Sequence, residues 1–244
     1  MNKSKLPGRA LQIATSCFSC QNKDQTEWCV LAEDDLALID RVKTSKTYQQ
    51  GQLIYAQGEP ANSIYCIESG TVAIRRMDVD GGSKILRLAH AGQTLGYADY
   101  FGQKGYNGNA EALGTCTVCH IESASLRTLL DHNPGLGLRF LSHVAQDLKD
   151  ADESSMQQAL YTVRIRLAHL LLALKERYAT VGDDGTLKLT LPMTRQDIAA
   201  LLGARPETIY RTIQQMEEDK VLTFSGHDVL IPDLDLLLDE IEAH

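Results

Sequence analysis

The clearest alternation of apolar and polar positions lies between Thr194 and Met216, where apolar residues recur in two short blocks at helical spacing. Thr194 is a suitable N-cap for the first block, and Asp197 follows three residues later, as in a capping box. Gly203 ends this block because glycine adopts the left-handed conformation of a helix C-terminus. Pro206 begins the second block, where its missing N–H costs nothing. The pattern predicts two short helices joined by a tight turn.

The second of these helices has one apolar and one polar face. Ile209, Ile213 and Met216 share the inward face at helical spacing, and charged and polar residues remain outside. A helix-turn-helix that exposes Arg and Glu at the start of its second helix is suited to contact base edges in a major groove. The alternative is a surface helical hairpin; the polar residues at the exposed start of the second helix favour DNA binding. The residues expected at DNA are Thr194, Arg195, Arg205, Pro206, Glu207, Thr208, Tyr210 and Arg211.

The segments around this motif complete a small domain. Residues 163 to 178 have the pattern of an apolar helix, and the run KLTLPM after them is strand-like. Beyond the two short helices, the sequence VLTFSGHDVLIP predicts a hairpin that turns at residues 225 to 228. Helix, helix-turn-helix and hairpin together predict a winged helix.

The middle of the chain, residues 50 to 125, alternates short apolar runs with glycine turns. Many short strands at this spacing predict a small antiparallel barrel or jelly roll. Enzymes built on such barrels usually present a metal-binding HxH pair, and this stretch contains none. A barrel enzyme is therefore disfavoured.

A helical pattern from Leu136 to about Leu160 connects the two halves. Residues stepping by three and four form a heptad seam, which is apolar at first and polar further on. Such a helix is either a dimer interface or a helix packed on its own barrel. We favour the dimer, because helix-turn-helix proteins commonly bind paired half-sites. The expected dimerisation residues are Leu141, Val144, Leu148, Ala151 and Ser155.

Cysteines gather in the sequence CFSCQNKDQTEWC, where Cys17 and Cys20 form a C-x2-C pair and Cys29 follows after eight residues. Thiolates this close together can converge on one iron–sulfur cluster or zinc ion. The fourth donor is Cys119 or Cys116 in the strand-like GTCTVCHIE, where residues three apart point to opposite faces. Cys66 lies in the strand-like run SIYCIESG and is interpreted as a buried small hydrophobe rather than a ligand.

The composition predicts the cellular compartment and sets one constraint on nucleic acid binding. The 244 residues contain no segment typical of a signal peptide or membrane span, which predicts a cytoplasmic protein without membrane contact. In a reducing cytosol, six cysteines favour metal or redox chemistry over structural disulfides. The net charge of −8 counts mildly against nucleic acid binding, which needs local positive charge. Arg195, Arg205 and Arg211 supply a local basic face in the predicted helix-turn-helix.

The order of barrel, long helix and winged helix resembles the CRP/FNR family of bacterial transcription regulators. The resemblance covers about residues 17 to 235, and its most specific motifs are GQLIYAQGEPANSIYCIESGTVAI and LTLPMTRQDIAALLGARPETIYRTI. It implies an α+β chain with a cysteine-rich segment at 1–30, a cyclic-nucleotide-binding-like β-barrel or jelly roll at 31–134, a dimerisation helix at 135–162 and a winged helix at 163–244. The implied partners are a second copy of the chain, double-stranded DNA with a palindromic site, and RNA polymerase.

Within the family, the cysteines resemble those of the FNR branch, which holds an oxygen-sensitive [4Fe–4S] cluster. This resemblance assigns the ligands to Cys17, Cys20, Cys29 and Cys119, with Cys116 as the alternate. The gap before Cys29 is longer than in the best-known FNR pattern, so a [2Fe–2S] cluster is an alternative. A further alternative is a family member that senses NO or CO through heme, or redox state through thiols alone. The candidate heme ligands are the histidines at positions 90, 120, 132, 143 and 169.

Two comparisons with other members sharpen the expected function. Cyclic AMP-binding members carry Gly-Glu and Arg-Ser pairs, whereas this chain has Tyr97 in place of the glutamate and Tyr106-Asn107 in place of Arg-Ser. No cAMP response is expected, because a cyclic phosphate would meet no arginine fork.

The family's base-contacting glutamate and arginine match Glu207 and Arg211, which keep their E-x3-R spacing. A function of another class, a metalloenzyme or electron carrier, is disfavoured because it needs no recognition helix.

Overall fold

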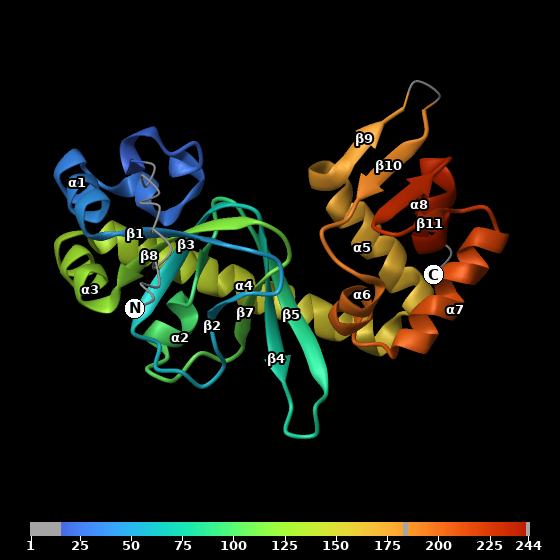
Figure 1. The fold of residues 1–244 in the computed structure, drawn as a ribbon, viewed down its shortest axis with the longest axis horizontal. Helices are drawn as coiled ribbons and strands as arrows, with labels where there is room; N and C mark the ends of the chain where they lie inside the picture. Colours follow the sequence, from blue (N-terminus) through green and yellow to red (C-terminus); the bar gives the residue numbers. More distant parts are fainter. Residues whose placement is uncertain (1–15, 183–184, 243–244) are drawn as a thin grey trace, which may run out of the picture.

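The computed structural model describes residues 16–182 and 185–242. The chain forms an N-terminal sensor domain and a C-terminal domain, joined by the long helix α4 (Pro134–Leu160), as Figure 1 shows. Pro134 occupies the first turn of α4, where proline is tolerated. Among the described residues, no helix is long and apolar enough to cross a membrane.

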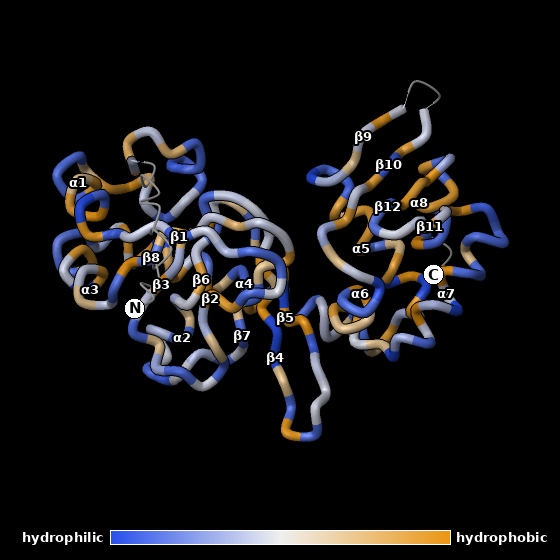
Figure 2. Tube along the Cα trace, in the orientation of Figure 1, coloured by the Kyte–Doolittle hydropathy of each residue, from blue (hydrophilic) through white to orange (hydrophobic). Residues whose placement is uncertain are grey.

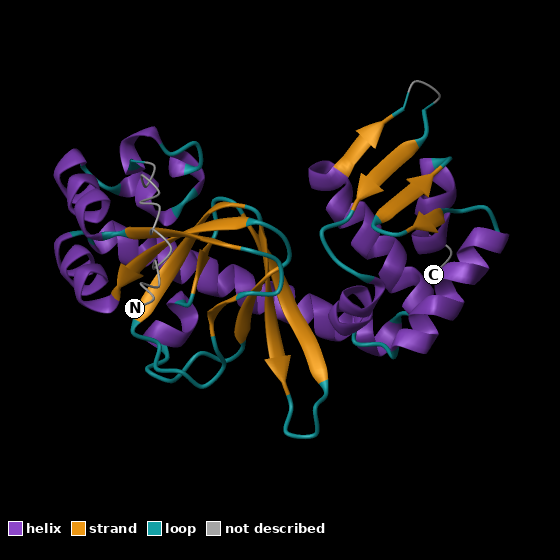
Figure 3. Ribbon diagram, in the orientation of Figure 1, coloured by secondary structure: helices purple, strands orange, loops and turns teal. Residues whose placement is uncertain are grey.

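Eight strands of the sensor domain form two four-stranded antiparallel sheets (Figure 3). One sheet has the order β1 (Thr44–Tyr48), β8 (Cys116–Glu122), β3 (Ser63–Ser69) and β6 (Thr94–Leu95). The other has the order β2 (Leu53–Tyr55), β7 (Asn109–Ala112), β4 (Thr71–Met77) and β5 (Ser83–His90). Buried residues of both sheets, such as Ile67, Val72 and Val118, form one apolar cluster between them. The predicted α+β jelly roll is confirmed, but the sheets do not close into a barrel within residues 16–182 and 185–242.

A second apolar cluster lies on the other side of the β3–β8 sheet and ties the cysteine segment to the helices. It joins Trp28 to Ile121 of β8 and Phe140 of α4. Three helices surround this region: α1 (Glu33–Val42), α2 (Tyr97–Phe101) and α3 (Ser123–His132). The cysteine segment forms the short 3-10 helices η1 (Cys17–Ser19), η2 (Lys23–Gln25) and η3 (Glu27–Val30). Such short turns lack the apolar periodicity that a sequence pattern can reveal.

The C-terminal domain is the predicted winged helix. Helix α5 (Val163–Tyr178) has the predicted bounds, and the two short helices are α6 (Arg195–Leu202) and α7 (Pro206–Glu218). The predicted hairpin is β11 (Thr223–Ser225) with β12 (Asp228–Ile231), in a sheet of order β11-β12-β10-β9 that includes β10 (Leu187–Thr190) and β9 (Ala179–Val181). Helix α8 (Leu234–Glu242) follows. Figure 2 shows the hydrophobic segments of α5, β10 and β12 gathered in the interior of this domain.

The two domains contact each other directly through the β4–β5 hairpin. Ala73 of β4 and Ile85 of β5 belong to the same buried cluster as Ile198 of α6. Beside this cluster, Thr71 Oγ1 lies 2.7 Å from the Tyr178 hydroxyl of α5. The first helix of the helix-turn-helix is thus packed on the sensor domain.

Candidate functional site

The geometry of the helix-turn-helix begins with the cap of α6. The Thr194 hydroxyl accepts a hydrogen bond from the Asp197 amide at 3.2 Å, and Asp197 Oδ2 accepts one from the Thr194 amide at 2.9 Å. This capping box fixes the start of α6. Gly203 ends α6 with φ of 63°, the left-handed conformation expected for a glycine at this position.

Helix α7 buries Ile209, Ile213 and Met216 and exposes a polar face. Glu207, Tyr210, Arg211 and Gln214 lie on that face, and all four are exposed. No ion pair within the described part of the chain involves Glu207 or Arg211, so a mutual pairing does not occupy them. Both side chains are available to a ligand outside the domain.

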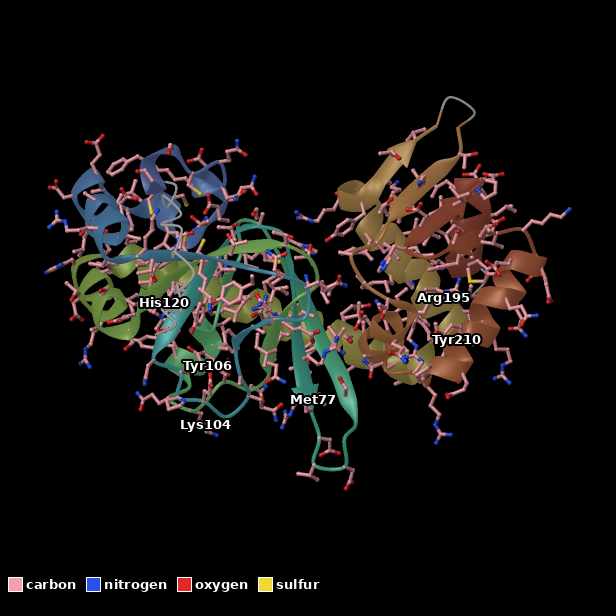
Figure 4. All side chains as sticks on the ribbon, viewed as in Figure 1. Met77, Lys104, Tyr106, His120, Arg195 and Tyr210 are labelled. Atoms are coloured by element: carbon pink, nitrogen blue, oxygen red, sulfur yellow. The ribbon has the colours of Figure 1, made fainter. Side chains whose placement is uncertain are left out.

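The residues flanking α7 differ in their availability. Arg205 is exposed at the N-cap of α7, with Pro206 at the first helical position and Thr208 half-buried. Arg195 is held more firmly: its Nη2 donates to the Phe224 carbonyl at 3.2 Å. The Arg195 guanidinium also lies 5.7 Å from the Tyr210 ring centroid, and Figure 4 labels both residues on this domain. Arg195 therefore positions Tyr210 as well as carrying charge.

A second candidate site lies in the sensor domain, where a cavity of about 30 Å³ opens between the cysteine segment and the β3–β8 sheet. Thiols from both sides line it. They belong to Cys17, Cys20, Cys66 and Cys119. Cys116, on the same strand as Cys119, is buried in the core between the sheets, and its thiol donates to the Thr71 carbonyl at 3.1 Å. The predicted opposite orientation of these two cysteines is confirmed.

Charged groups position and surround the thiols of this cavity. Asp40 of α1 accepts a hydrogen bond from the Cys17 amide at 2.6 Å, and Lys43 Nζ lies 3.2 Å from the Cys17 sulfur. Burial raises the pKa of the Cys17 thiol, although the neighbouring Lys43 ammonium acts in the opposite direction. Burial likewise raises the pKa of Cys119 to about 11, again opposed by Lys43. The ammonium favours thiolates here, which is the form that binds metals.

Cys29 lies away from this cavity. Its sulfur accepts a hydrogen bond from Arg139 Nη2 of α4 at 3.3 Å. Its neighbours in η3 also contact α4: His143 Nδ1 forms a 2.8 Å ion pair with the fully buried Glu27, and the Trp28 and Phe140 rings lie edge to face at 5.8 Å. The Glu27 carboxylate raises the pKa of His143. The structure thus brings together three of the four predicted ligands and places the fourth against the long helix.

Sequence reasoning missed the partners Lys43 and Arg139 and the position of Cys66 in the cavity. The strand-like pattern around Cys66 indicated burial, but the register between strands that places it beside Cys119 leaves no trace in a single sequence. Contacts such as Arg139 to Cys29 join residues 110 positions apart, and no local pattern signals them.

Comparisons with known proteins match both halves of the chain. Residues 45–133 match the cyclic nucleotide-binding domain, and residues 165–240 match the Crp-like helix-turn-helix domain. An anaerobic regulatory protein of Haemophilus influenzae is 28% identical over 236 residues, which are 95% of this chain and 91% of that protein. The fumarate and nitrate reduction regulatory protein of Escherichia coli is 27% identical over 94% of this chain and 92% of its own length.

The solved structure of FixK2 from Bradyrhizobium japonicum agrees, with a TM-score of 0.71 and 25% identity over 81% of this chain and 96% of that chain. This chain belongs to the CRP/FNR family of transcription regulators. A CRP/FNR family regulator from Thermus thermophilus shares the fold, with a TM-score of 0.65 and 22% identity over 82% of this chain and 98% of that chain. The chain is therefore a DNA-binding regulator and not an enzyme, and both domain matches exclude the cysteine segment.

CRP/FNR regulators act as dimers, and α4 presents an exposed apolar face suited to pairing. Of the predicted seam, Leu141 and Leu148 are 62% and 63% exposed. Val144 packs partly against the sensor domain, whereas Ala151 and Ser155 line a separate cavity between α4 and β5. The remaining exposed apolar residues of α4 are Leu138, Met156 and Leu160. The seam residues stay a prediction.

The cavity beside α4 measures about 500 Å³ and occupies the cyclic nucleotide-binding domain. Its lining includes Arg87 but also the carboxylates of Asp99, Asp147 and Asp150. Tyr97 donates to Asp147 at 2.5 Å, and Tyr106 stacks on Tyr55 with ring centroids 3.9 Å apart. Internal contacts thus occupy the two tyrosines that replace the family's nucleotide-holding residues, and the expected lack of a cAMP response stays a prediction.

Proposed function

We propose that this chain regulates transcription in response to oxygen or a related oxidant, through an iron–sulfur cluster bound at the cysteine cavity. The observation that carries the proposal is the convergence of Cys17 and Cys20 with Cys119 of β8 at one cavity. Soft thiolates suit iron–sulfur clusters. The relatives named anaerobic and fumarate–nitrate reduction regulators support a role in the anaerobic response. The resemblance to the FNR branch assigns the fourth thiolate to Cys29.

The donors of the proposed site are thiols from the cysteine segment and from β8. No group of three or more His, Cys, Asp or Glu in the described residues is arranged to hold one metal ion. Thiolates would hold either a zinc ion or an iron–sulfur cluster, and the iron and sulfide content of the purified protein distinguishes the two. The cavity lies between residues 17–30 and the β3–β8 sheet, so a bound cluster would influence the position of this segment.

A shift of residues 17–30 on cluster binding would be transmitted to the dimer helix through contacts of this chain. Glu27, Trp28 and Cys29 contact α4 on the side of the segment away from the cavity. When bound, the cluster would supply an oxidisable group between residues 17–30 and the β3–β8 sheet. Acidic residues crowd the middle of α4, which opposes pairing of two parallel copies: Asp147, Asp150, Asp152 and Glu153. A difference of a few kcal/mol between the two segment positions would shift such a marginal dimer.

The DNA-contacting residues follow from the polar face of α7. We propose that Arg211 reads a guanine and Glu207 a cytosine in each half of a palindromic site. Arg205, Thr194 and Arg195 contact phosphates. RNA polymerase is the proposed protein partner at the promoter.

The absorption spectrum of protein purified without oxygen tests the sensing group. We expect a broad visible band, with iron and sulfide in equal amounts, that disappears in air. Sedimentation of the same samples should give more dimer before air exposure than after it. A sharp Soret band would indicate heme instead, and a colourless protein without iron would exclude the cluster. Equal dimer fractions in both states would exclude control through dimerisation.

A further inference from the structure

The cysteine cavity contains a thiol that the family resemblance does not account for. Cys66 of β3 lies directly opposite Cys119 of β8 in the antiparallel ladder. Residues paired in this way share one face of the sheet, with Cβ atoms about 4.5–5.5 Å apart. Cys66 therefore faces the same side as Cys119, toward the cysteine segment.

Both strand cysteines meet the cysteine segment at the same cavity. Its lining combines Cys66 and Cys119 from the sheet with Cys17 and Cys20 from the segment. Burial raises the pKa of the Cys66 thiol, and the nearby Cys119 and Glu27 act in the same direction, whereas a hydrogen bond with Trp28 lowers it. Four thiols from two strands and one segment thus surround one space, which is the number that a [4Fe–4S] cluster requires.

Cys29 is anchored elsewhere. To reach the cavity, its sulfur must leave the Arg139 guanidinium, which is 3.3 Å away. The same turn is held by the fully buried Glu27, whose Oε2 accepts a 2.6 Å hydrogen bond from Thr94. Removing a buried charge from its partners is costly. Moving Cys29 therefore disturbs contacts that Cys66 does not have to break.

We propose that Cys66, in place of Cys29, supplies the fourth thiolate of the metal centre, beside Cys17, Cys20 and Cys119. The inference rests on the proposed function, because it assigns a ligand to the cluster proposed above. Each thiol releases its proton to solvent when its sulfur binds iron. Cys29 is then not a ligand, and η3 connects the metal centre to α4 through the chain rather than through a coordinated thiolate.

Iron and sulfide content of full-length variants, purified without oxygen, tests the assignment. Cys66→Ala should lose most of the iron, whereas Cys29→Ala should keep the wild-type content. Cys116→Ala is the matched control, since Cys116 is also buried but faces the opposite core. Circular dichroism before and after heating establishes that each variant is folded. Retention of iron in Cys66→Ala, or its loss in Cys29→Ala, would overturn the inference.

Alkylation of the loaded wild-type protein gives a second measurement that needs no variant. Iodoacetamide added without oxygen should modify the partly exposed Cys29 and leave the four cavity cysteines unmodified. Protection of Cys29 that is lifted by iron chelation would show it to be a ligand and overturn the inference. A wild-type protein that contains no iron or sulfide would instead refute the proposed function, so the two failures are distinguishable.

Discussion

At the scale of single residues, the polar side chains of α7 decide sequence recognition. Arg211→Ala should weaken specific DNA binding by roughly 1–3 kcal/mol and relax the preference at one base pair per half-site. The reason is the loss of a bidentate contact to guanine O6 and N7. Selection of binding sites from random DNA, followed by titration of the selected sites, measures both effects.

Arg205→Ala is the control, because Arg205 lies at the N-cap of α7 and is expected at phosphate. This variant should weaken binding to all sequences about equally and reduce its salt dependence. An unchanged consensus for Arg211→Ala would mean that Arg211 does not read a base.

Much of this residue-scale detail could be predicted because it depends on neighbours in sequence. Thr194, Asp197 and Gly203 were expected as cap and stop signals, and their bonds and dihedral angles agree. The Cys116 and Cys119 orientations followed from the two-residue period of a strand. The position of Cys66 in the cavity could not be predicted in this way, because it depends on which strand lies beside β3.

At the scale of elements, one arginine joins three of them. Arg75 of β4 donates to Glu111 of β7 at 2.7 Å and to Asp197 of α6 at 2.6 Å. The Asp197 carboxylate thus serves two purposes: Oδ2 caps α6, and Oδ1 binds the sensor domain. The start of the helix-turn-helix is held by the same carboxylate that fixes its position on the β4–β5 hairpin.

Arg75→Ala should lower the free energy of unfolding by roughly 1–3 kcal/mol, because it leaves two carboxylates without their shared cation. The estimate is reduced for partial exposure, since the Arg75 and Asp197 side chains are each 15% exposed. Denaturant titration measures the loss. Arg76→Ala is the control, because the adjacent Arg76 is exposed and should change stability by less than about 0.5 kcal/mol. Equal free energies of unfolding for wild type and Arg75→Ala would show that the ion pairs of Arg75 do not contribute to stability.

The same contact has a pH signature with a defined sign. Burial acts to raise the pKa of Asp197, but the hydrogen bonds from Thr194 and Arg75 outweigh it, and the pKa is lowered from 3.8. A lowered carboxylate pKa stabilises the fold above the unfolded value and loses that stabilisation as the pH falls through the folded value. Below about pH 3.8, wild type should therefore lose stability more steeply than Arg75→Ala.

Element-scale prediction succeeded where periodicity was strong and failed where it was weak. Helices α5, α6 and α7 and the β11–β12 hairpin lie where the pattern placed them. The 3-10 turns of the cysteine segment are too short to have a period. The docking of α6 on β5 could not be predicted, because it depends on tertiary contacts between distant segments.

At the scale of the whole molecule, the exposed leucines of α4 predict how two copies associate. Leu148→Glu should weaken the dimer by at least about 2 kcal/mol, or more than about tenfold in dissociation constant, because each copy loses a buried leucine. The stability of the separate chain should not change, since Leu148 is 63% exposed there. Sedimentation equilibrium without oxygen measures the association.

Gln146→Glu is the control for added charge. Gln146 lies two positions from Leu148 on α4 and therefore points to a different face of the helix. It should leave the dimer within about threefold of wild type, an effect under about 0.7 kcal/mol. A Leu148→Glu protein that dimerises as well as wild type would place the interface elsewhere.

The apolar cluster shared by the β4–β5 hairpin and α6 also limits how these regulators can exchange parts. Recombination after α4 would join the winged helix of one regulator to the β4–β5 hairpin of another. Ala73 and Ile85 would then pack against side chains that differ from their present partners. The smallest portable unit is therefore discontinuous in the gene: the winged helix together with residues 71–90 of the sensor domain. Functional chimeras between relatives should retain these two segments as a pair inherited from one parent.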